Sequence, residues 1–575
     1  MKILIVYPYF LENRINTEDI SAVPIGAYYV GAMLKSHGYD VKILNLHDAG
    51  KDADRIKELL VAEKPDVIGF SIFNANRWGG IDIARMAKQL DPEVITVFGG
   101  IGATYLWEHL LGHFPAVDYV VLGEGEYTFL NLVRLIERDD LSSVYELAGI
   151  ACRDNGKPKK NRAVEAIARL DDLPDPARYF TCNHVVLTRG CPGNCNFCGS
   201  PTFWGRKVRF HSADYFVRQV RRLAEKGVSF FYVSDDTFTL KKPLVIDICK
   251  QLSALNLNIA WAAISRVNYV DRELLTWMRR AGCIQISYGV ESGSEKIRDF
   301  FCKNISTQDI RSAFRLTKSH GIMARAYFIY GAKGETADTI DESIRLLHDI
   351  GPLSTIFYIL DIFPGTRLYE DFLLQTHNTD DIWLNRVEDI LYFETDDELD
   401  RDMVLDFGNR LRTAFFKGLP EYVRELTLVD DKTLYPHHAD FLSRLAMTFS
   451  HGDYAANPAI IDAGSLSNYL HRKALTYSPD HRAFLGLGIA LQKKGDYPGS
   501  EDILAKGISH FPDSPSLHIC LAVSLMNRGE YREALDLLLK FHRHPDAVPR
   551  IAACYEALGD RSQAGRHTHD THRQP

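Results

Sequence analysis

Short runs of hydrophobic residues alternate with segments of helical periodicity along the first 140 residues. The runs cover residues 3–7, 41–46, 67–73, 94–100 and 119–123. Between them, segments such as 25–37 and 80–90 repeat apolar residues at helical spacing. Strands that alternate with helices at this interval predict a mostly parallel, doubly wound, flavodoxin-like sheet over residues 1–140.

Small and polar residues gather where these predicted strands end. Open parallel sheets bind ligands beyond the carboxyl ends of their strands, and glycine lets the backbone approach a ligand closely. No Gly-x-Gly-x-x-Gly sequence opens the first helix, so the pattern is not a dinucleotide-binding fingerprint. The candidate ligand-binding residues are Ser71, Asn74, Trp78, Gly99, Gly100, Gly102, Ala103, Thr104, Gly123, Glu124 and Gly125.

A second series of strand and helix patterns follows a linker predicted over residues 141–180. The strands are expected at residues 184–188, 230–234, 259–264, 284–288, 325–330 and 356–362. Helical patterns intervene, for example over 213–226, 242–255 and 271–281. Six such units predict an incomplete parallel (β/α)6 barrel over residues 181–375, with its chemistry at the strand ends.

Three cysteines stand directly after the first strand of this series. Cys191, Cys195 and Cys198 are separated by three and by two residues on a loop rich in Gly and Pro. Structural zinc sites use four ligands, and no fourth Cys or His lies at finger spacing. Ferredoxin clusters also use four thiolates per four-iron cluster. Three thiolates therefore favour a [4Fe-4S] cluster with one iron open to a ligand.

The other predicted strands of this series also end in charged residues or glycines. These are Asp235 and Asp236 after the second strand, Arg266 after the third, Glu291 after the fourth, and Gly331 with Gly334 after the fifth. Each has a purely structural alternative, because Asp caps helices, Glu pairs with Arg, and glycine forms turns. Their order, with one group at each strand end, favours a binding site.

The cysteine spacing, with Phe197 between the last two cysteines, resembles the signature of the radical S-adenosylmethionine (SAM) superfamily. The resemblance implies a cluster held by Cys191, Cys195 and Cys198. It also implies that SAM is bound by residues at the strand ends. These are Phe197, Asp235, Asp236, Arg266, Glu291, Gly331 and Gly334. Ala332-Lys333 departs from the family, which usually has a Phe/Leu-Pro-Gly variant at this point.

In the first domain, residues 24–26, 99–104 and 118–126 resemble the cobalamin-binding domain that precedes many radical SAM enzymes. This resemblance implies that the candidate residues above bind cobalamin, with Trp78 or Arg77 available to cover its lower face. The Asp-x-His-x-x-Gly pattern that supplies a cobalt-ligating His is not cleanly present. Asn45-x-His47-x-x-Gly50 follows the second strand rather than the first and is interpreted as a chance match.

Beyond about residue 380 the strand pattern stops. Residues 381–426 are amphipathic and predict a helical cap within a region of residues 376–455. Gly495-Asp-Tyr497 and Gly529-Glu-Tyr531 are 34 residues apart, a period that resembles tetratricopeptide repeats over residues 456–565. The repeats would form either a docking arm or a folding or dimerisation appendage. His567, His569 and His572 belong to a polar tail over 566–575 that is expected to fray.

Composition limits the remaining possibilities. The 575 residues carry a net charge of −8, which argues against a general nucleic-acid binder. No apolar stretch approaches the roughly 20 residues of a membrane span, and the N-terminus carries no signal-peptide pattern. A cytoplasmic location follows as an expectation, and there a tight cysteine cluster indicates metal binding or catalysis rather than disulfides.

The two resemblances together predict an enzyme that uses a [4Fe-4S] cluster, SAM and cobalamin. The expected reaction is methylation of an unactivated carbon through a 5′-deoxyadenosyl radical and methylcobalamin. The alternatives are cyclisation or rearrangement without methyl transfer, a vestigial first domain on another radical enzyme, and a repeat scaffold with a structural cluster. An external electron donor such as flavodoxin or ferredoxin is required. No catalytic acid or base is identified, and the substrate is open, with the repeats hinting at a peptide or carrier-bound molecule.

Overall fold

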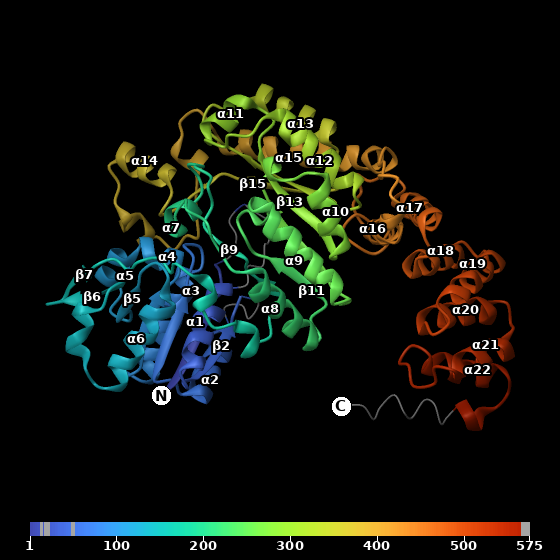
Figure 1. The fold of residues 1–575 in the computed structure, drawn as a ribbon, viewed down its shortest axis with the longest axis horizontal. Helices are drawn as coiled ribbons and strands as arrows, with labels where there is room; N and C mark the ends of the chain where they lie inside the picture. Colours follow the sequence, from blue (N-terminus) through green and yellow to red (C-terminus); the bar gives the residue numbers. More distant parts are fainter. Residues whose placement is uncertain (12–14, 16–23, 48–51, 565–575) are drawn as a thin grey trace. The chain divides into compact units, whose positions relative to one another are not determined.

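The computed structural model describes residues 1–11, 15, 24–47 and 52–564 (Figure 1). Contacts divide the chain into two compact units, Met1–Leu316 with Ala324–Phe415, and Thr317–Met323 with Phe416–Pro575. Both α/β modules belong to the first unit. Within the described residues, no helix combines the length and the apolar character that a membrane span requires. Gly50 and the histidine tail lie outside the described residues.

The first module is a seven-stranded sheet with the order β2-β1-β3-β4-β5-β6-β7. Strands β1 to β5 pair in parallel, and β6 and β7 extend the sheet antiparallel. Strand β1 is buried along almost its whole length, as expected for a parallel strand covered by helices on both faces. The strands are β1 (Lys2–Tyr7), β2 (Asp40–Asn45), β3 (Val67–Ser71), β4 (Ile95–Gly99), β5 (Tyr119–Val121), β6 (Ile150–Asp154) and β7 (Lys157–Lys160). The helices are α1 (Ile25–Ser36), α2 (Ala53–Glu63), α3 (Arg77–Leu90), α4 (Ile101–Tyr105), α5 (Trp107–His113) and α6 (Gly125–Glu137).

The segment expected as a linker over residues 141–180 contains strands β6 and β7. Asn155 and Gly156 join them with φ values of 49° and 78°. Two consecutive residues with positive φ form the tight turn that suits a two-residue hairpin, and Asn-Gly is the preferred sequence for it. That dipeptide was the sequence signal for the hairpin. The first sheet therefore extends farther along the chain than its hydrophobic runs indicate.

The second module is a six-stranded sheet with the order β15-β14-β13-β12-β11-β8. The pairs β8–β11, β11–β12, β12–β13 and β14–β15 are parallel, and helices follow successive strands. The strands are β8 (His184–Val185), β11 (Phe230–Val233), β12 (Ala260–Ser265), β13 (Cys283–Glu291), β14 (Met323–Tyr330) and β15 (Ser354–Ile359). The helices between them are α7 (Ser200–Trp204), α8 (Ala213–Glu225), α9 (Lys242–Ala254), α10 (Arg272–Arg280), α11 (Glu295–Phe300), α12 (Thr307–Ser319) and α13 (Ala337–Ile350). A short antiparallel pair, β9 (Thr188–Arg189) with β10 (Arg209–Phe210), flanks the cysteine loop.

After the last strand the chain returns to the first module. The helix predicted over 381–426 begins only at Arg401, as α15 (Arg401–Arg424). Before it come α14 (Arg367–Thr376), the 3-10 turns η6 (Asp380–Leu384) and η7 (Tyr392–Thr395), and an antiparallel pair of β16 (Asp361–Ile362) with β17 (Ile390–Leu391). Trp383 is fully buried in the hydrophobic core of the first module, and its Nε1 donates to the Tyr369 hydroxyl over 2.7 Å. Packing against that core, rather than helical periodicity, decides the conformation here.

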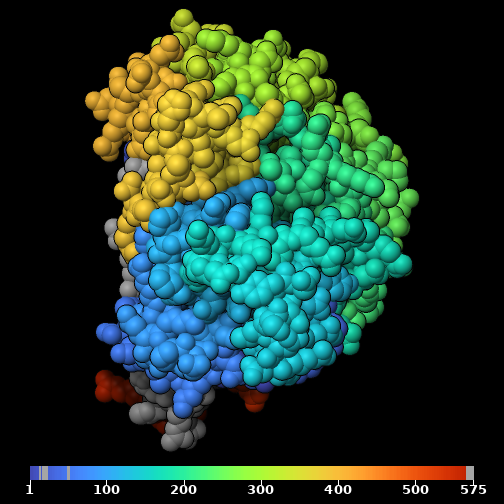
Figure 2. Space-filling view, turned by 90° about the vertical axis from the view of Figure 1, so that its left-hand side faces the viewer, coloured from blue at the N-terminus to red at the C-terminus, as the bar shows by residue number. Residues whose placement is uncertain are grey.

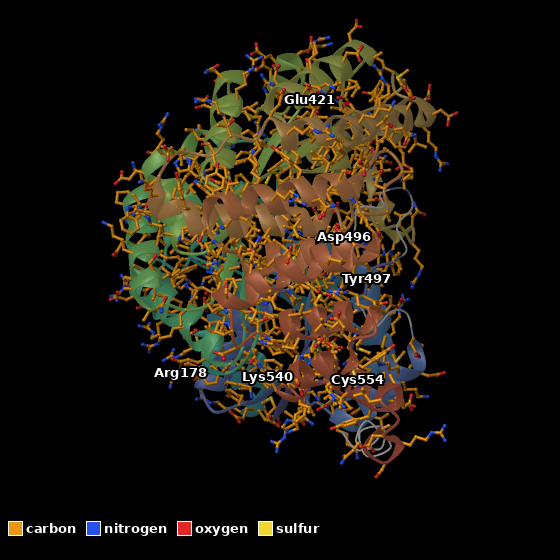
Figure 3. The ribbon with its side chains drawn as sticks, turned by 90° about the vertical axis from the view of Figure 1, so that its right-hand side faces the viewer. Arg178, Glu421, Asp496, Tyr497, Lys540 and Cys554 are labelled. Atoms are coloured by element: carbon orange, nitrogen blue, oxygen red, sulfur yellow. The ribbon has the colours of Figure 1, made fainter. Side chains whose placement is uncertain are left out.

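The second unit is helical. Its helices are α16 (Tyr435–Thr448), α17 (Ala463–Tyr477), α18 (His481–Lys493), α19 (Tyr497–His510), α20 (Pro515–Asn527), α21 (Tyr531–Leu539) and α22 (Val548–Ala557), and each packs against the next. Gly495 and Gly529 follow α18 and α20 with φ of 76° and 85°, a left-handed conformation that favours glycine after a helix end. Asp496 then caps α19 by accepting from the Gly499 N–H over 3.0 Å (Figure 3). The 34-residue repetition thus marks equivalent turns between successive helix pairs.

Residues 361–395, which lead from the second module back to the first, are called the returning segment below. Trp383→Ala tests whether the returning segment stabilises the first unit. Removal of a fully buried aromatic ring should lower the free energy of unfolding by about 3–5 kcal/mol. Denaturant titration followed by circular dichroism measures the loss. Leu374→Ala is the matched control, since Leu374 is 74% exposed and its truncation should change stability by less than about 0.5 kcal/mol. Equal effects of the two changes would contradict the packing role of Trp383.

Candidate cofactor-binding site

The three cysteines lie on the loop between β9 and α7. All are half-buried free thiols. A Cβ atom placed on Gly193 would lie 3.3 Å from Cys191 Sγ and 3.9 Å from Cys195 Sγ, so two of the sulfurs flank this glycine closely. A larger residue at position 193 would crowd the space between them. The loop therefore brings two soft sulfur ligands close to a residue without a side chain.

The surroundings of the thiols suit a bound cluster. Burial raises the pKa of the Cys198 thiol to about 12, and the neighbouring Asp236, Cys195 and Cys191 add to the rise. Uncompensated thiolates are unfavourable there, whereas metal binding deprotonates and stabilises them. The Arg266 guanidinium approaches Cys195 Sγ with Nη1 at 4.0 Å. Three such sulfurs fit an iron–sulfur cluster better than a hard cation.

The two carboxylates after β11 have different environments. Asp235 is buried, and its Oδ1 accepts from the backbone N–H groups of Leu187 and Thr188 at 2.8 and 3.1 Å. Burial raises its pKa to about 7. Asp236 lines the cavity described below and accepts a hydrogen bond from the Ser200 hydroxyl. Asp235 thus holds the start of β9, the strand that leads into the cysteine loop. Asp236 is the carboxylate available to a ligand.

Glu291 ends β13 in a left-handed conformation with φ of 64°. Its Oε1 accepts from Lys303 Nζ over 2.6 Å, and both side chains are buried. The ion pair passes over Gly289, where a Cβ would collide with the Glu291 carboxylate and lie 2.6 Å from Lys303 Nζ. Arg266 Nη2 donates to the Lys303 carbonyl over 2.7 Å. Lys303, which sequence reasoning missed, links two of the predicted site residues.

The remaining predicted SAM residues lie after β14 and within the cysteine loop. Gly331 and Gly334 have φ of 82° and 70°, and the Gly331 N–H donates to Glu335 Oε2 over 2.5 Å. Burial raises the pKa of Glu335 to about 7. Phe197 packs edge-on against Phe301 with ring centroids 5.0 Å apart. These contacts shape turns and an apolar wall next to the cysteine loop.

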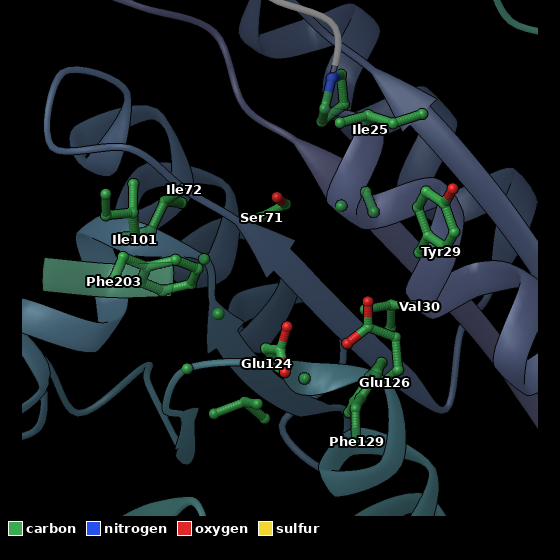
Figure 4. Close-up of a pocket in the computed structure, with 18 of the residues that line it drawn as sticks. Ile25, Tyr29, Val30, Ser71, Ile72, Ile101, Glu124, Glu126, Phe129 and Phe203 are labelled. Atoms are coloured by element: carbon green, nitrogen blue, oxygen red, sulfur yellow. The ribbon is translucent and has the colours of Figure 1, made fainter. Parts of the chain in front are cut away.

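A cavity lies between the strand ends of the first module and the segments of the second module that flank the cysteine loop, β9 and α7. Its cavity volume is about 310 Å³. In Figure 4 Ile25 and Tyr29 line one side and Ile101 and Phe203 the opposite side, with Ser71 between them. A large, mostly apolar cleft with a few polar groups is the usual form of a cofactor site.

The predicted cobalamin residues divide into two sets. Those that line the cavity are Ser71, Gly99, Gly100, Gly123, Glu124 and Gly125. Those that do not are Asn74, Trp78, Gly102, Ala103 and Thr104. Gly26 also lines it, and a Cβ there would meet nothing within 4 Å, so glycine at this position leaves cavity space open. The bare backbone at these glycines fits a broad, flat ligand.

The five residues outside the cavity have structural contacts instead. A Cβ on Gly102 would lie 2.5 Å from the Phe73 backbone, so this glycine permits a close crossing of two chain segments. Trp78 Nε1 donates to the Asn385 carbonyl over 3.1 Å, and its neighbour Arg77 is fully buried and donates to Val387 over 2.7 Å. Both side chains therefore hold the returning segment rather than facing the cavity.

A buried ion network joins the two modules at the floor of the cavity. Arg189, two residues before Cys191, donates to Glu124 Oε1 over 2.9 Å and to Glu126 Oε1. Arg209 Nη1 and the Ile167 N–H reach Glu124 Oε2 at 2.7 and 2.6 Å. Burial by itself would lower the pKa of Arg189, but the two carboxylates raise it, so the guanidinium stays charged. Sequence reasoning assigned Glu124 to the cofactor and missed Arg189.

An α/β module that opens onto an apolar cleft, joined to a parallel sheet with a three-thiol loop, suits an enzyme that combines an iron–sulfur cluster with a further cofactor. The sequence matches the B12 binding domain over residues 20–133 and the radical SAM superfamily over residues 185–347. The chain belongs to the B12-binding radical SAM family, whose cofactors are a [4Fe-4S] cluster, SAM and cobalamin.

Relatives within this family include enzymes with different reactions. An uncharacterized methyltransferase of Pyrococcus horikoshii is 31% identical over 64% of this chain and 83% of its own length. An anaerobic magnesium-protoporphyrin IX monomethyl ester cyclase of Rubrivivax gelatinosus is 28% identical over 64% of this chain and 70% of its own length. The family is therefore shown by sequence, while the reaction differs among its members.

Two solved structures share the fold. The cobalamin-dependent SAM radical enzyme OxsB with aqua-cobalamin bound has a TM-score of 0.56 at 17% identity, covering 99% of this chain and 84% of that one. The radical SAM methyltransferase TsrM from Kitasatospora setae also has a TM-score of 0.56 at 17% identity, covering 65% and 76%. At this identity the likeness concerns the fold.

Glu124→Gln tests the buried ion network through its pH dependence. Burial would raise the Glu124 pKa, but Arg209, Arg189 and the Ile167 N–H together hold it below its ordinary value of 4.5. The carboxylate therefore contributes stability that is complete above pH 4.5 and disappears as the pH falls through the lowered pKa. At neutral pH the change should cost about 2 kcal/mol of unfolding free energy, and the difference from the wild type should shrink in acid.

Denaturant unfolding at a series of pH values measures this difference. Glu146→Gln is the control, because Glu146 is exposed and should give a change within about 0.5 kcal/mol at every pH. A Glu124→Gln penalty that stays constant down to the acid limit would contradict the assigned role of the carboxylate.

Proposed function

We propose that this protein methylates an unactivated carbon of its substrate. The cavity between the two modules carries this proposal, because it is lined by the strand-end glycines of the first module and by Asp236 next to the cysteine loop. When bound, SAM with the cluster supplies a 5′-deoxyadenosyl radical, and cobalamin supplies a transferable methyl group. The cavity is lined by the strand-end glycines and by one predicted SAM residue, Asp236, and this placement of Asp236 favours joint use of SAM and cobalamin over a vestigial first domain.

The residues of the chain would divide the binding tasks. Cys191, Cys195 and Cys198 would hold the cluster, with Gly193 keeping the space between them free. The cavity carboxylate Asp236 has the charge that suits the SAM amino group. Arg266 would sit beside the cluster, positioned by its hydrogen bond to Lys303.

Other predicted SAM contacts would act through shape. Phe197 and the turns at Gly331 and Gly334 would line the space around the nucleoside part of SAM. Glu291 and Lys303 would lie beside it and neutralise each other's charge. Asp235 would orient the loop rather than touch SAM. Ser71, Gly99, Gly100, Gly123 and Gly125 would offer backbone and hydroxyl groups to cobalamin.

The expected finer architecture also belongs to this proposal. The strand order β2-β1-β3-β4-β5 supports a flavodoxin-like first domain, and the six-stranded second sheet supports a partial (β/α)6 barrel. Helix pairs joined by glycine turns support a tetratricopeptide-like arm that docks a macromolecular or carrier-bound substrate. An external electron donor such as flavodoxin or ferredoxin would reduce the cluster.

Cyclisation without methyl transfer is the second candidate reaction. A cyclase from Rubrivivax gelatinosus is 28% identical over 391 residues, close to the 31% identity of the methyltransferase relative over 385 residues. The cavity suits either reaction, since both need cobalamin near SAM. The two reactions differ in what they form from SAM, because only methyl transfer yields S-adenosylhomocysteine.

Product analysis under anaerobic, reducing conditions tests the proposed function. The reconstituted protein with hydroxocobalamin should release both 5′-deoxyadenosine and S-adenosylhomocysteine from SAM when supplied with a substrate. 5′-Deoxyadenosine without S-adenosylhomocysteine would favour cyclisation, and absence of bound cobalamin would overturn the two-cofactor proposal. Asp236→Asn should lower 5′-deoxyadenosine formation about tenfold, or 1.4 kcal/mol, because it removes the carboxylate charge.

Cluster content provides the control for the cysteine assignment. Replacement of Cys191, Cys195 and Cys198 by Ala should abolish bound iron and sulfide and the cluster absorbance. Cys520→Ala, in the second unit, should leave the iron content, the sulfide content and the cluster absorbance unchanged. Retention of a full cluster by the triple variant would exclude the thiol loop as its site.

A further inference from the structure

A second group of metal-ligand side chains lies apart from the cofactor cavity, where α5 meets the returning segment. His109 and His113 are four residues apart on α5 and therefore share one helix face. Asp381, on η6, places its Oδ1 2.9 Å from His113 Nε2. One ligand atom from each of the three residues lies within 4.8 Å of the others.

His109 is the unusual member of this group. Its side chain is only 4% exposed, and neither ring nitrogen has a hydrogen-bond partner among the described residues. A buried polar group without a partner carries a desolvation cost that a ligand could remove. An imidazole nitrogen without another hydrogen-bond partner can ligate a metal ion.

The charge around the group favours a cation. The carboxylates of Glu108, Asp380 and Asp381 lie close to one another at this junction. Negative charge thus accumulates at this junction, opposed by Arg77 on its inner side. Two imidazoles and a carboxylate form a borderline-soft ligand set that suits zinc-class cations rather than magnesium or calcium.

We propose that His109, His113 and Asp381 bind one divalent cation of the zinc class, which fastens η6 to α5. The ligand atoms need to approach to about 3.4 Å from one another around a tetrahedral ion. The exposed side chains can move to achieve this, since His113 and Asp381 are 39% and 64% exposed. Solvent at this edge would complete the coordination.

The position of the site indicates its consequence for the fold. Figure 2 shows the segment of α14 and η6 (yellow) against the first module (blue). Two residues after Asp381, Trp383 enters the core of that module, where the Arg77 guanidinium stacks on its ring at 4.5 Å. The returning segment is already held by the buried Trp383 and by the hydrogen bonds from Arg77 and Trp78. A bound cation would be a third connection between this segment and the first module. The site is therefore structural and does not depend on the proposed methyl transfer.

Zinc binding by the full-length reconstituted holoenzyme tests the proposal. The cluster occupies the Cys191 loop, and replacement of His567, His569 and His572 by Ala removes a competing ligand source in the tail. Equilibrium dialysis against buffered free Zn²⁺, with elemental analysis, should give one zinc per chain. His113→Ala and Asp381→Asn, both at exposed positions, should weaken binding at least about tenfold.

His542→Ala is the matched control, an exposed histidine in the second unit whose loss should leave zinc affinity unchanged. Thermal unfolding gives a second readout, because Zn²⁺ should raise the melting temperature of the parent and the control but not of the two variants. No zinc retained by the parent, or equal affinity in parent and variants, would overturn the site. Neither measurement uses enzyme activity, so failure here leaves the proposed function untouched.

Discussion

The buried ion network around Arg189 is the constraint on which the rest of the site depends. Arg189 lies two residues before Cys191, and its partners Glu124 and Glu126 lie at the start of α6 in the other module. Its guanidinium also stacks on Tyr29 and Trp204 at 5.3 and 5.0 Å, and both rings line the cavity. Loss of one partner from such a buried ion pair leaves an uncompensated charge, which is strongly unfavourable. The ion pairs of Arg189 with Glu124 and Glu126 therefore set the distance between the cysteine loop and the strand-end glycines of the first module.

The returning segment closes the same unit from the opposite side. Trp383 inserts into the core of the first module, and Arg77 and Trp78 hold the adjacent carbonyls. The last strand of the second sheet is therefore tied back to the first sheet through the chain that follows it. The ion network and the returning segment together hold the two modules in contact, and the cavity is the space that remains between them.

Part of this architecture was predictable from the sequence. Hydrophobic runs located the strands of both sheets to within a few residues, since buried parallel strands have apolar side chains on both faces. The hairpin of β6 and β7 was missed because its strands are short and polar, although Asn155-Gly156 signalled the turn. The helix expected from residue 381 begins at Arg401 because Trp383 packs into a distant core. Periodicity within a segment carries no information about such partners.

The sequence by itself determined the local chemistry: three thiols on one short loop, glycines where strands end, and one charged group or glycine per strand end. These features depend on spacing along a few residues, which the chain encodes directly. Only the tertiary structure decided which carboxylate faces the cavity, that Glu124 pairs with Arg189 65 residues away, and that Trp78 points at the returning segment. Such pairings require the packing of segments far apart in sequence, and burial then forces every charge among them to find a partner.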